Sequence, residues 1–504
     1  MTKLENKSRN KFRDRKKHLD DIIKNKPKRQ FNNKLVVLGS GGIGTSVIPL
    51  LREFINIPLE NITIIDKLES AFKNIDPKIK RHNVKITKDN YEKVFIKDLK
   101  LGQDDIIIDA SYDINTEDMY RLCNKYGISY TNSAMETWEL EKMDPKDETF
   151  EARFKAVEAA CKDDKKKCNF VVSMGCNPGN VSIWALYALE RINKIKHNYK
   201  YTSYADLAKK LGLKTVHISE NDNQVHKTPK RPNTYLNTWS GDCESWYDEA
   251  FHHLELSWGT HEKTKPDNLN KTVSSKYEYI VDQKGLDSWA KTYTPHSKEM
   301  KGMLIRHEEC YTLAKGLTLT NDKDHVDYKP SCYYIYKPCK ASMESLQEVI
   351  DNSSGDTLTY QDNVEMLIGD VKEGKDELGC TLFFEDGEVY WVGSLLDIKE
   401  ARKLFDNKYK NIINATILQV LAGYMGSMFH ILDLMKKKKY KGFILPEHMP
   451  VKKFVKWTRP LLGKFGLTKV EDWPKNLKKS WQFGDFYAGN YSVFKKKRPA
   501  ETLK

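Results

Sequence analysis

The stretch KLVVLGSGGIGTS, residues 34–46, decides the fold of this 504-residue chain. A run of apolar β-formers, 35–38, leads directly into three glycines in the pattern G-x-G-x-x-G. A helix-like segment follows at 45–54, and a second apolar run, 61–66, ends in an acid. This order of strand, glycine turn, helix, strand and acid is typical of a βαβ unit that binds a dinucleotide.

Each glycine of this turn meets a physical demand. The first permits the tight turn, the second lets the backbone approach a pyrophosphate, and the third allows the helix to pack closely on the strand. The N-terminus of the helix offers free N–H groups to the phosphates. Asp66 would accept both ribose hydroxyls and repel a 2′-phosphate, which favours NAD over NADP. We therefore predict that NAD is bound by Gly39, Gly41, Gly42, Ile43, Gly44 and Asp66.

Alternation of strands and helices continues for about 150 residues and indicates an α/β fold with a Rossmann-type, doubly wound parallel sheet. Further apolar strands are predicted near 84–86, 105–109, 129–132 and 170–173. Ligands of such sheets gather at the carboxyl ends of the strands. The residues expected on this cofactor side are Ala110, Ser111, Asn132, Asn177 and Pro178.

Changes in composition and in predicted secondary structure divide the chain into four parts. Residues 1–31 are predicted to be a disordered basic arm, and 32–179 the NAD-binding domain. Residues 180–435 mix short strand-like runs with polar loops, which favours an α+β substrate-binding and dimerisation domain with antiparallel strands. Its last helix can pack back on the first domain. Residues 436–504 form a basic C-terminal extension.

The net charge of +14 invites a nucleic-acid interpretation, but its distribution argues otherwise. Residues 1–31 carry +8 and residues 436–504 carry +14, which leaves −8 for the body. An acidic body suits a cationic substrate better than a polyphosphate. Nucleic-acid binding remains a hypothesis for the two basic ends.

Cysteine usage and hydropathy indicate a cytoplasmic protein. The nine cysteines are scattered and form no C-x-x-C pair, so we expect free thiols in a reducing compartment and no metal site. The basic N-terminus has no apolar core of a signal peptide. The apolar stretch 412–435 is long enough to span a bilayer, but polar side chains interrupt it, and we expect a buried helix and no membrane.

Acids and aromatic residues alternate in the middle of the chain. They do so in NTWSGDCESWYDE, residues 237–249, and in WGTHE, residues 258–262. Such a mixture suits an ammonium guest, because carboxylates pair with its charge and an indole face adds about 2 kcal/mol by cation–π contact. Solvated loop acids and core tryptophans explain the same residues equally well.

Seven tracts in this order resemble homospermidine synthases of the bacterial type, which belong to the saccharopine-dehydrogenase-like NAD(P)-binding enzymes. The tracts are Gly175-Cys-Asn-Pro-Gly179, His217-Ile-Ser-Glu220, Asn237-Thr-Trp239-Ser240, Trp258-Gly-Thr-His-Glu262, Ile305-Arg-His307-Glu308, Asp376-Glu-Leu-Gly379 and Tyr390-Trp-Val-Gly-Ser394. The resemblance implies a homodimer that holds NAD as a prosthetic group.

The resemblance also implies a reaction. Two putrescines are joined into homospermidine with loss of ammonia: NAD takes a hydride from one amine, the second amine attacks the resulting imine, and the hydride returns. Hydride can leave only from a carbon whose amine is neutral, so a base is needed. Carboxylates and an aromatic face in a water-poor pocket would stabilise the cationic iminium.

The family's site residues transfer to positions that match its motifs. Trp239 would be the cation–π platform, with Glu220 and Glu249 anchoring the ammonium groups and His307 acting as proton shuttle or polar contact. Asn177 and Pro178 would lie between nicotinamide and substrate, with Glu136 nearby.

Two positions are less regular. Alignment backwards from Trp258 places Glu249 at the second anchor, whereas alignment forwards from Trp239 places Tyr247 there. The family tends to have a basic residue after the His-Ile-Ser-Glu string, and this chain has Asn221.

Two alternatives remain. A related saccharopine or carboxyspermidine dehydrogenase would need Arg or Lys clamps for substrate carboxylates. A catalytically silent NAD-binding scaffold with nucleic-acid-binding tails would use only the basic ends. Within the synthase interpretation, putrescine and spermidine both fit as the amine.

Trp239 gives a direct test of the ammonium interpretation. We expect Trp239→Ala to fold and bind NAD but to suppress product formation, and Trp239→Phe to retain part of the activity, because a phenyl face is a weaker cation platform. Product measured by mass spectrometry, with thermal melting as the control, decides the point. Equal activity of the alanine variant and the wild type would refute the role.

Overall fold

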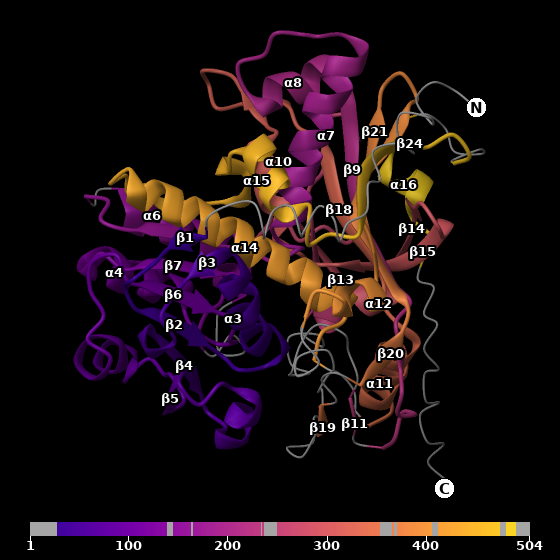
Figure 1. Ribbon diagram of the computed structural model, residues 1–504. Coiled ribbons are helices and arrows are strands. Elements are labelled where there is room, and N and C mark those ends of the chain that lie inside the picture. The colour runs from indigo at the N-terminus through magenta and orange to yellow at the C-terminus, as the bar shows by residue number, and fades with distance from the viewer. Residues whose placement is uncertain are drawn as a thin grey trace, which may run out of the picture.

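The computed structural model describes residues 28–138, 145–162, 165–232, 234–235, 249–352, 365–366, 370–405, 412–473 and 480–489. Two seven-stranded sheets organise them, and a single long helix runs between the sheets (Figure 1). This arrangement of a Rossmann-type sheet and a second mixed sheet confirms the predicted α/β class.

All neighbouring strands of the first sheet are parallel. Their spatial order is β23, β8, β7, β6, β2, β4, β5. The sequence order therefore reverses between β2 and β6, which is the switch point where open α/β sheets bind ligands. The strand bounds are β2 Leu35–Leu38, β4 Ile62–Asp66, β5 Lys80–Asn83, β6 Ile106–Asp109, β7 Ser129–Asn132, β8 Asn169–Val171 and β23 Gly442–Ile444.

The central strand of this sheet is buried on both faces. Leu35, Val36, Val37 and Leu38 are each at most 1% exposed. Such continuous apolar runs are typical of parallel strands covered by helices on both sides. Within the described residues the α-helices are α3 Gly42–Phe54, α4 Thr116–Tyr126, α5 Pro145–Glu148, α6 Phe150–Lys162, α7 Asn180–Lys196, α8 Tyr204–Leu211, α10 Glu308–Gly316, α11 Lys340–Asn352, α12 Ile398–Arg402, α14 Ala415–Lys436, α15 Val451–Thr458 and α16 Phe483–Phe486.

The second sheet is mixed, which corrects the expectation of antiparallel strands. β9 and β18 pair in parallel, while the other five pairings of this sheet are antiparallel. More than 100 residues, including α10, separate β9 from β18, and this length permits the crossover that a parallel pair requires. In spatial order the strands are β14 Trp289–Thr294, β15 Lys298–Ile305, β18 Ser331–Lys337, β9 Leu213–Asp222, β21 Lys375–Phe384, β22 Val389–Asp397 and β24 Lys464–Lys469.

Short strand pairs surround the two sheets. They are β1 Arg29–Gln30 with β3 Ile55–Asn56, β10 Val225–His226 with β20 Val371–Glu373, β11 Thr234–Tyr235 with β19 Glu365–Met366, β12 His253–Leu256 with β13 Tyr279–Lys284, and β16 Leu319–Thr320 with β17 Val326–Tyr328.

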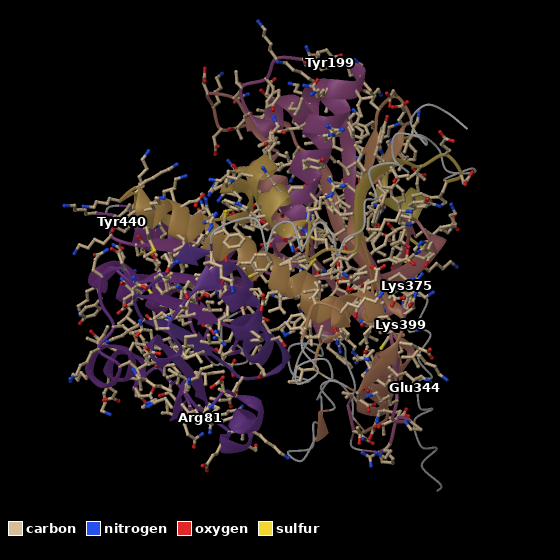
Figure 2. All side chains as sticks on the ribbon, viewed as in Figure 1. Arg81, Tyr199, Glu344, Lys375, Lys399 and Tyr440 are labelled. Atoms are coloured by element: carbon tan, nitrogen blue, oxygen red, sulfur yellow. The ribbon has the colours of Figure 1, made fainter. Side chains whose placement is uncertain are left out.

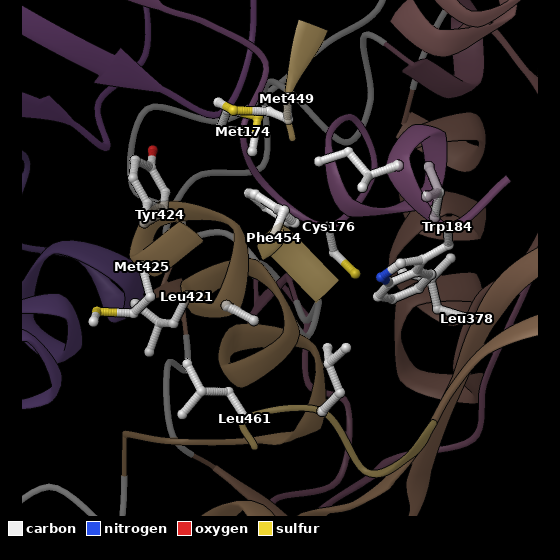
Figure 3. Packing of buried hydrophobic residues seen from close by; sticks show 14 of the residues in the cluster. Met174, Cys176, Trp184, Leu378, Leu421, Tyr424, Met425, Met449, Phe454 and Leu461 are labelled. Atoms are coloured by element: carbon white, nitrogen blue, oxygen red, sulfur yellow. The ribbon is translucent and has the colours of Figure 1, made fainter. Parts of the chain in front are cut away.

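Helix α14 joins the two domains. Tyr424 donates its hydroxyl hydrogen to the carbonyl oxygen of Asp109 in the parallel sheet, 2.5 Å away, and Ser427 lies 2.9 Å from Thr131. At its other end, Thr416 donates to Asp376 in the second sheet. Figure 3 shows the apolar part of this junction, where Tyr424 and Leu421 of α14 lie among side chains from both domains.

The same helix is long and apolar enough to cross a membrane, by length and composition alone. Of the residues in its most apolar window, however, 94% are buried inside the protein. α14 is therefore a buried core helix. Its polar side chains Thr416, Tyr424 and Ser427 make hydrogen bonds to the two sheets.

The two ends of the chain are more integrated than the sequence boundaries suggest. Residues 436–473, set apart as an extension, supply β23 to the first sheet and β24 to the second. Arg29 lies within the predicted arm, yet it donates to Asp433 of α14 and pairs through β1 with β3. The fold therefore extends beyond residue 473 and includes the last residues of the predicted arm, whereas residues 1–27 are outside the described residues.

Gly423 tests the contact of α14 with the first domain. A Cβ at this position would lie 2.1 Å from the Gly175 carbonyl oxygen and 2.4 Å from that of Met174. We expect Gly423→Ala to lower the free energy of unfolding by about 1–3 kcal/mol, because helix and turn must separate.

The matched control is Gly466→Ala in β24, where an added Cβ meets nothing within 4 Å. Chemical denaturation should show this variant unchanged or slightly more stable. Equal stability of the two alanine variants would mean that α14 does not need its close approach to the turn.

Candidate active site

The residues predicted to bind NAD lie at the carboxyl edge of the parallel sheet. The glycine turn follows β2, and an acid or amide ends β4 and β7, next to the switch point between β2 and β6. The residues that the structure places along this edge are Gly39, Gly41, Gly42, Ile43, Gly44, Asp66, Ala110, Ser111 and Asn132.

The glycine turn has the shape that a pyrophosphate requires. No side chain caps the N-terminus of α3, which begins after Gly41. A Cβ added to Gly41 would meet no atom within 4 Å, so the space beside it is open, whereas one on Gly44 would lie 1.8 Å from the Gly39 carbonyl oxygen. Open backbone at the helix N-terminus and tight packing behind it fit a dinucleotide.

Asp66 is held at the end of β4 by the turn itself. One carboxylate oxygen accepts from the backbone N–H of Ser40 at 2.7 Å and from its hydroxyl at 2.8 Å. The other accepts from the backbone N–H of Leu68 at 2.8 Å. These bonds fix an anionic group beside the glycine turn, where a ribose would lie.

Glu220 is the centre of the substrate side. This carboxylate of β9 is 3% exposed and accepts from the amide of Asn177 at 2.9 Å and from the hydroxyl of Tyr334 at 2.6 Å. Burial, and next the charge of Asp222, raise the pKa of Glu220 to about 7. Asn177 and Pro178 belong to the turn after β8, so this contact joins the cofactor domain to the second sheet.

His307 lies between carboxylates at the start of α10. Its Nδ1 donates to Glu309, and its Nε2 lies 3.9 Å from Glu249. Burial lowers the pKa of His307, but the charges of Glu309 and Glu249 outweigh it and raise the pKa to about 10. The ring also packs edge-on against Tyr334, which bonds Glu220. At neutral pH His307 is therefore an imidazolium that donates rather than accepts.

Asp376 is an acid of this site to which sequence reasoning gave no role. It lies opposite Asp222 across the β9–β21 pair and is fully buried. Burial, followed by the charges of Glu220 and Asp222, raises its pKa well above the usual range. The signal was present in the tract Asp376-Glu-Leu-Gly379, but a single β-strand acid looks structural until its neighbours are known.

Three carboxylates, those of Asp376, Glu220 and Glu309, lie close enough to Cys176 to act on its thiol. Burial raises the pKa of its thiol, and the charges of Asp376, Glu220 and Glu309 add to this effect. The thiol sits in the turn 175–179, which follows β8. The acids from β9, β21 and α10 thus surround one turn of the cofactor domain.

Of the predicted catalytic residues that the structure describes, Glu136 lies apart from this cluster. The backbone N–H of Glu136 bonds Thr116, and its charge contributes to the raised pKa of Tyr424, so it lies at the cofactor edge. Trp239 and the alternative anchor Tyr247 lie outside the described residues, whereas Glu249 is inside them. The role of each residue remains a prediction.

Comparison with family models defines the class. Residues 35–169 match the model described as saccharopine dehydrogenase NADP binding domain, and residues 175–467 match the saccharopine dehydrogenase C-terminal domain. The protein is thus a saccharopine-dehydrogenase-like protein, with a dinucleotide domain followed by a second domain that completes its site.

Relatives identify the family within this class. The homospermidine synthase of Mesorhizobium japonicum is 30% identical over 450 residues, covering 86% of this chain and 90% of the relative. That of Blastochloris viridis is 27% identical over 448 residues, with the same coverage. The crystal structure of the Legionella pneumophila homospermidine synthase in complex with NAD is 27% identical, with a TM-score of 0.79 and coverage of 92% of this chain and 99% of that one. This chain belongs to the homospermidine synthase family, which confirms the resemblance seen in the sequence.

Gly41 provides a test of the cofactor edge. We expect Gly41→Ala to melt like the wild type, because the new Cβ meets no protein atom, but to bind NAD at least about tenfold more weakly, because that Cβ takes the space of the pyrophosphate. Gly102→Ala, where a Cβ is equally unobstructed, is the control for a bare glycine-to-alanine effect. Titration calorimetry measures both affinities, and unchanged NAD affinity in Gly41→Ala would place the phosphates elsewhere.

Proposed function

We propose that this protein is a homospermidine synthase that joins two putrescines, releases ammonia and uses NAD to remove and return one hydride. Membership of the family supports this proposal, and the site supplies its chemical basis. The observation that carries it is a set of buried carboxylate oxygens without donors.

Those oxygens belong to Asp376 and Glu309. Among the described residues no group donates to Asp376 Oδ1 or to Glu309 Oε1, although both side chains are at most 1% exposed. The second oxygen of each carboxylate does have a donor, His307 for Glu309 and Thr416 for Asp376. A buried acceptor that is left without a donor costs about 1–3 kcal/mol. A diamine with an ammonium group at each end would offset this cost, and its hydrocarbon centre suits the apolar surroundings.

The acids of the site divide into two tasks. With a pKa of about 7, Glu220 can accept a proton from a substrate ammonium at neutral pH, which gives the neutral amine that hydride removal requires. Asp376, deeper in the sheet, would hold the distal ammonium. His307, as an imidazolium, would donate to the departing amine.

NAD supplies the hydride acceptor and donor. The relative from Legionella pneumophila was crystallised with NAD, and Asp66 is fixed where it would repel the 2′-phosphate of NADP. Asn177 would then lie between nicotinamide and amine, because its turn touches both the cofactor domain and Glu220.

Three further features belong to the proposal. The protein acts as a homodimer, in keeping with the family resemblance. It works in the cytoplasm, which the eight free cysteines of the described residues support. Its substrate is putrescine, with spermidine as a second amine. Nucleic-acid binding stays a hypothesis for the basic ends, most of which lie outside the described residues.

The decisive assay mixes purified protein with putrescine and NAD and searches for homospermidine and ammonia. The proposal predicts both products in equal amounts with no net NADH. A saccharopine-type dehydrogenase would instead accumulate NADH only with an amino-acid substrate. Bound NAD without any product would leave the silent scaffold as the explanation and overturn the proposal.

Glu220 and Asp376 give a finer prediction. We expect Glu220→Gln and Asp376→Asn each to raise the KM for putrescine about tenfold or more, since a hydrogen bond to a charged group contributes about 1.5–3 kcal/mol. NAD affinity should change little. Glu373→Gln, an exposed acid on β20, is the control and should match the wild type.

The pH dependence follows from the raised pKa of Glu220. Its carboxylate is ionised above about pH 7 and protonated below it, so the KM of the wild type should rise as the pH falls through 7. Glu220→Gln should lose this part of the profile. If the KM of Glu220→Gln still rose as the pH fell through 7, the ionisation would belong to another group.

A further inference from the structure

Glu308, the first residue of α10, is a buried acid that the reaction described above does not use. It is 3% exposed and lies directly after His307, the N-cap residue of the helix. Its two oxygens accept hydrogen bonds from the cofactor domain, one from the backbone N–H of Met135 and one from the hydroxyl of Ser173.

The two partners belong to the loops that carry the predicted nicotinamide-side residues. Met135 directly precedes Glu136 in the loop after β7, and Ser173 lies four residues before Asn177 in the segment after β8. A single carboxylate from the second domain thus ties together two loops of the first. The carbonyl oxygen of Met135 also accepts from Arg153, so side chains hold both the N–H and the C=O of this residue.

Ser173 has a backbone that needs outside support. Its φ of +58° lies in the left-handed region, which costs a residue other than glycine roughly 1 kcal/mol or more. Its N–H donates to the side chain of Asn132, and its hydroxyl donates to Glu308. Strained residues of this kind persist where the surroundings fix them, and they concentrate at functional sites.

The segment Arg306–Glu309 contacts both domains. His307 and Glu309 pair with each other and lie next to Glu249. Glu308 bonds the cofactor loops, while Arg306 pairs with Glu255 of β12 at 2.7 Å and lies 3.3 Å from Glu148 of α5. His307 and Glu309, on the amine side, are therefore direct neighbours in the chain of Glu308, which holds the cofactor loops.

We propose that Glu308 is a positioning residue that sets the distance between the nicotinamide loops and the amine site, and so determines the rate of hydride transfer. This inference rests on the proposed function, since it concerns the same reaction. Glu308 touches neither substrate nor cofactor; it acts through Met135, Ser173 and the adjacent His307.

Geometry explains why such a tie affects rate more than binding. Hydride transfer needs its two carbon atoms in near contact, and a misplacement of about 1 Å can cost about 100-fold in rate. Ammonium binding depends on Glu220 and Asp376, which stand on strands of the second sheet rather than on the loops of Met135 and Ser173.

The test compares Glu308→Ala, Glu308→Gln and Ser173→Ala with the wild type. The measurements are the rate of NADH formation after rapid mixing with putrescine, the KM for putrescine, the NAD content and the melting temperature. Glu344→Gln is the control, because Glu344 lies on the exposed face of α11, away from both domains' junction (Figure 2).

We expect Glu308→Ala to slow hydride transfer about 10- to 100-fold with a nearly unchanged KM and with NAD still bound. Glutamine can accept from Met135 and donate to Ser173, so Glu308→Gln should restore the rate to within about threefold of the wild type. Ser173→Ala should slow transfer less than Glu308→Ala, and the double variant should be no slower than Glu308→Ala, because both changes break one link.

Three results would overturn the inference: a rate in Glu308→Ala equal to that of Glu344→Gln, a glutamine variant as slow as the alanine variant, or additive losses in the double variant. Should Glu308→Ala fail to fold, Ser173→Ala alone decides. A wild-type rate of hydride transfer in Ser173→Ala would then show that the bond between Ser173 and Glu308 does not position the loops. A wild type that forms neither NADH nor homospermidine would overturn the proposed function and this inference together, whereas equal rates among active variants would overturn the inference alone.

Discussion

The close approach of α14 to the turn 175–179 is the contact on which the rest of the molecule depends. Gly423 brings the helix against the carbonyl oxygens of Met174 and Gly175, and the helix contacts the parallel sheet through Tyr424 in its middle and the second sheet through Thr416 in its first turn. Because both sheets are packed on one helix, one apolar core extends through both domains. The turn that carries Asn177 is thereby fixed relative to Glu220, and the active site is formed by the same packing that holds the domains together.

The constraint has an electrostatic consequence. The second sheet presents acids from β9 and β21 to an interior that offers them few donors, and burial raises the pKa values of Glu220 and Asp376. Burying these acids costs free energy, which a bound cation would offset.

How much the sequence predicted depends on how local each feature is. The glycine turn, its strand and Asp66 are contiguous or nearly so, and their spacing alone indicated the parallel sheet and its cofactor edge. Asp376 and Glu308 were not recognised, because a buried acid acquires meaning only from partners brought in by other elements. The parallel pairing of β9 with β18 and the strands β23 and β24 depend on contacts between residues far apart in the chain, which periodicity does not reveal.

The central claim is that the buried carboxylates of the second sheet bind the ammonium groups of the substrate. A crystal structure of the protein with NAD and putrescine tests it most directly. The account predicts one putrescine nitrogen within hydrogen-bonding distance of Glu220 and the other within that distance of Asp376, with the intervening carbons beside the turn 175–179. A putrescine bound at any other place, with Glu220 and Asp376 still paired only to protein groups, would contradict it.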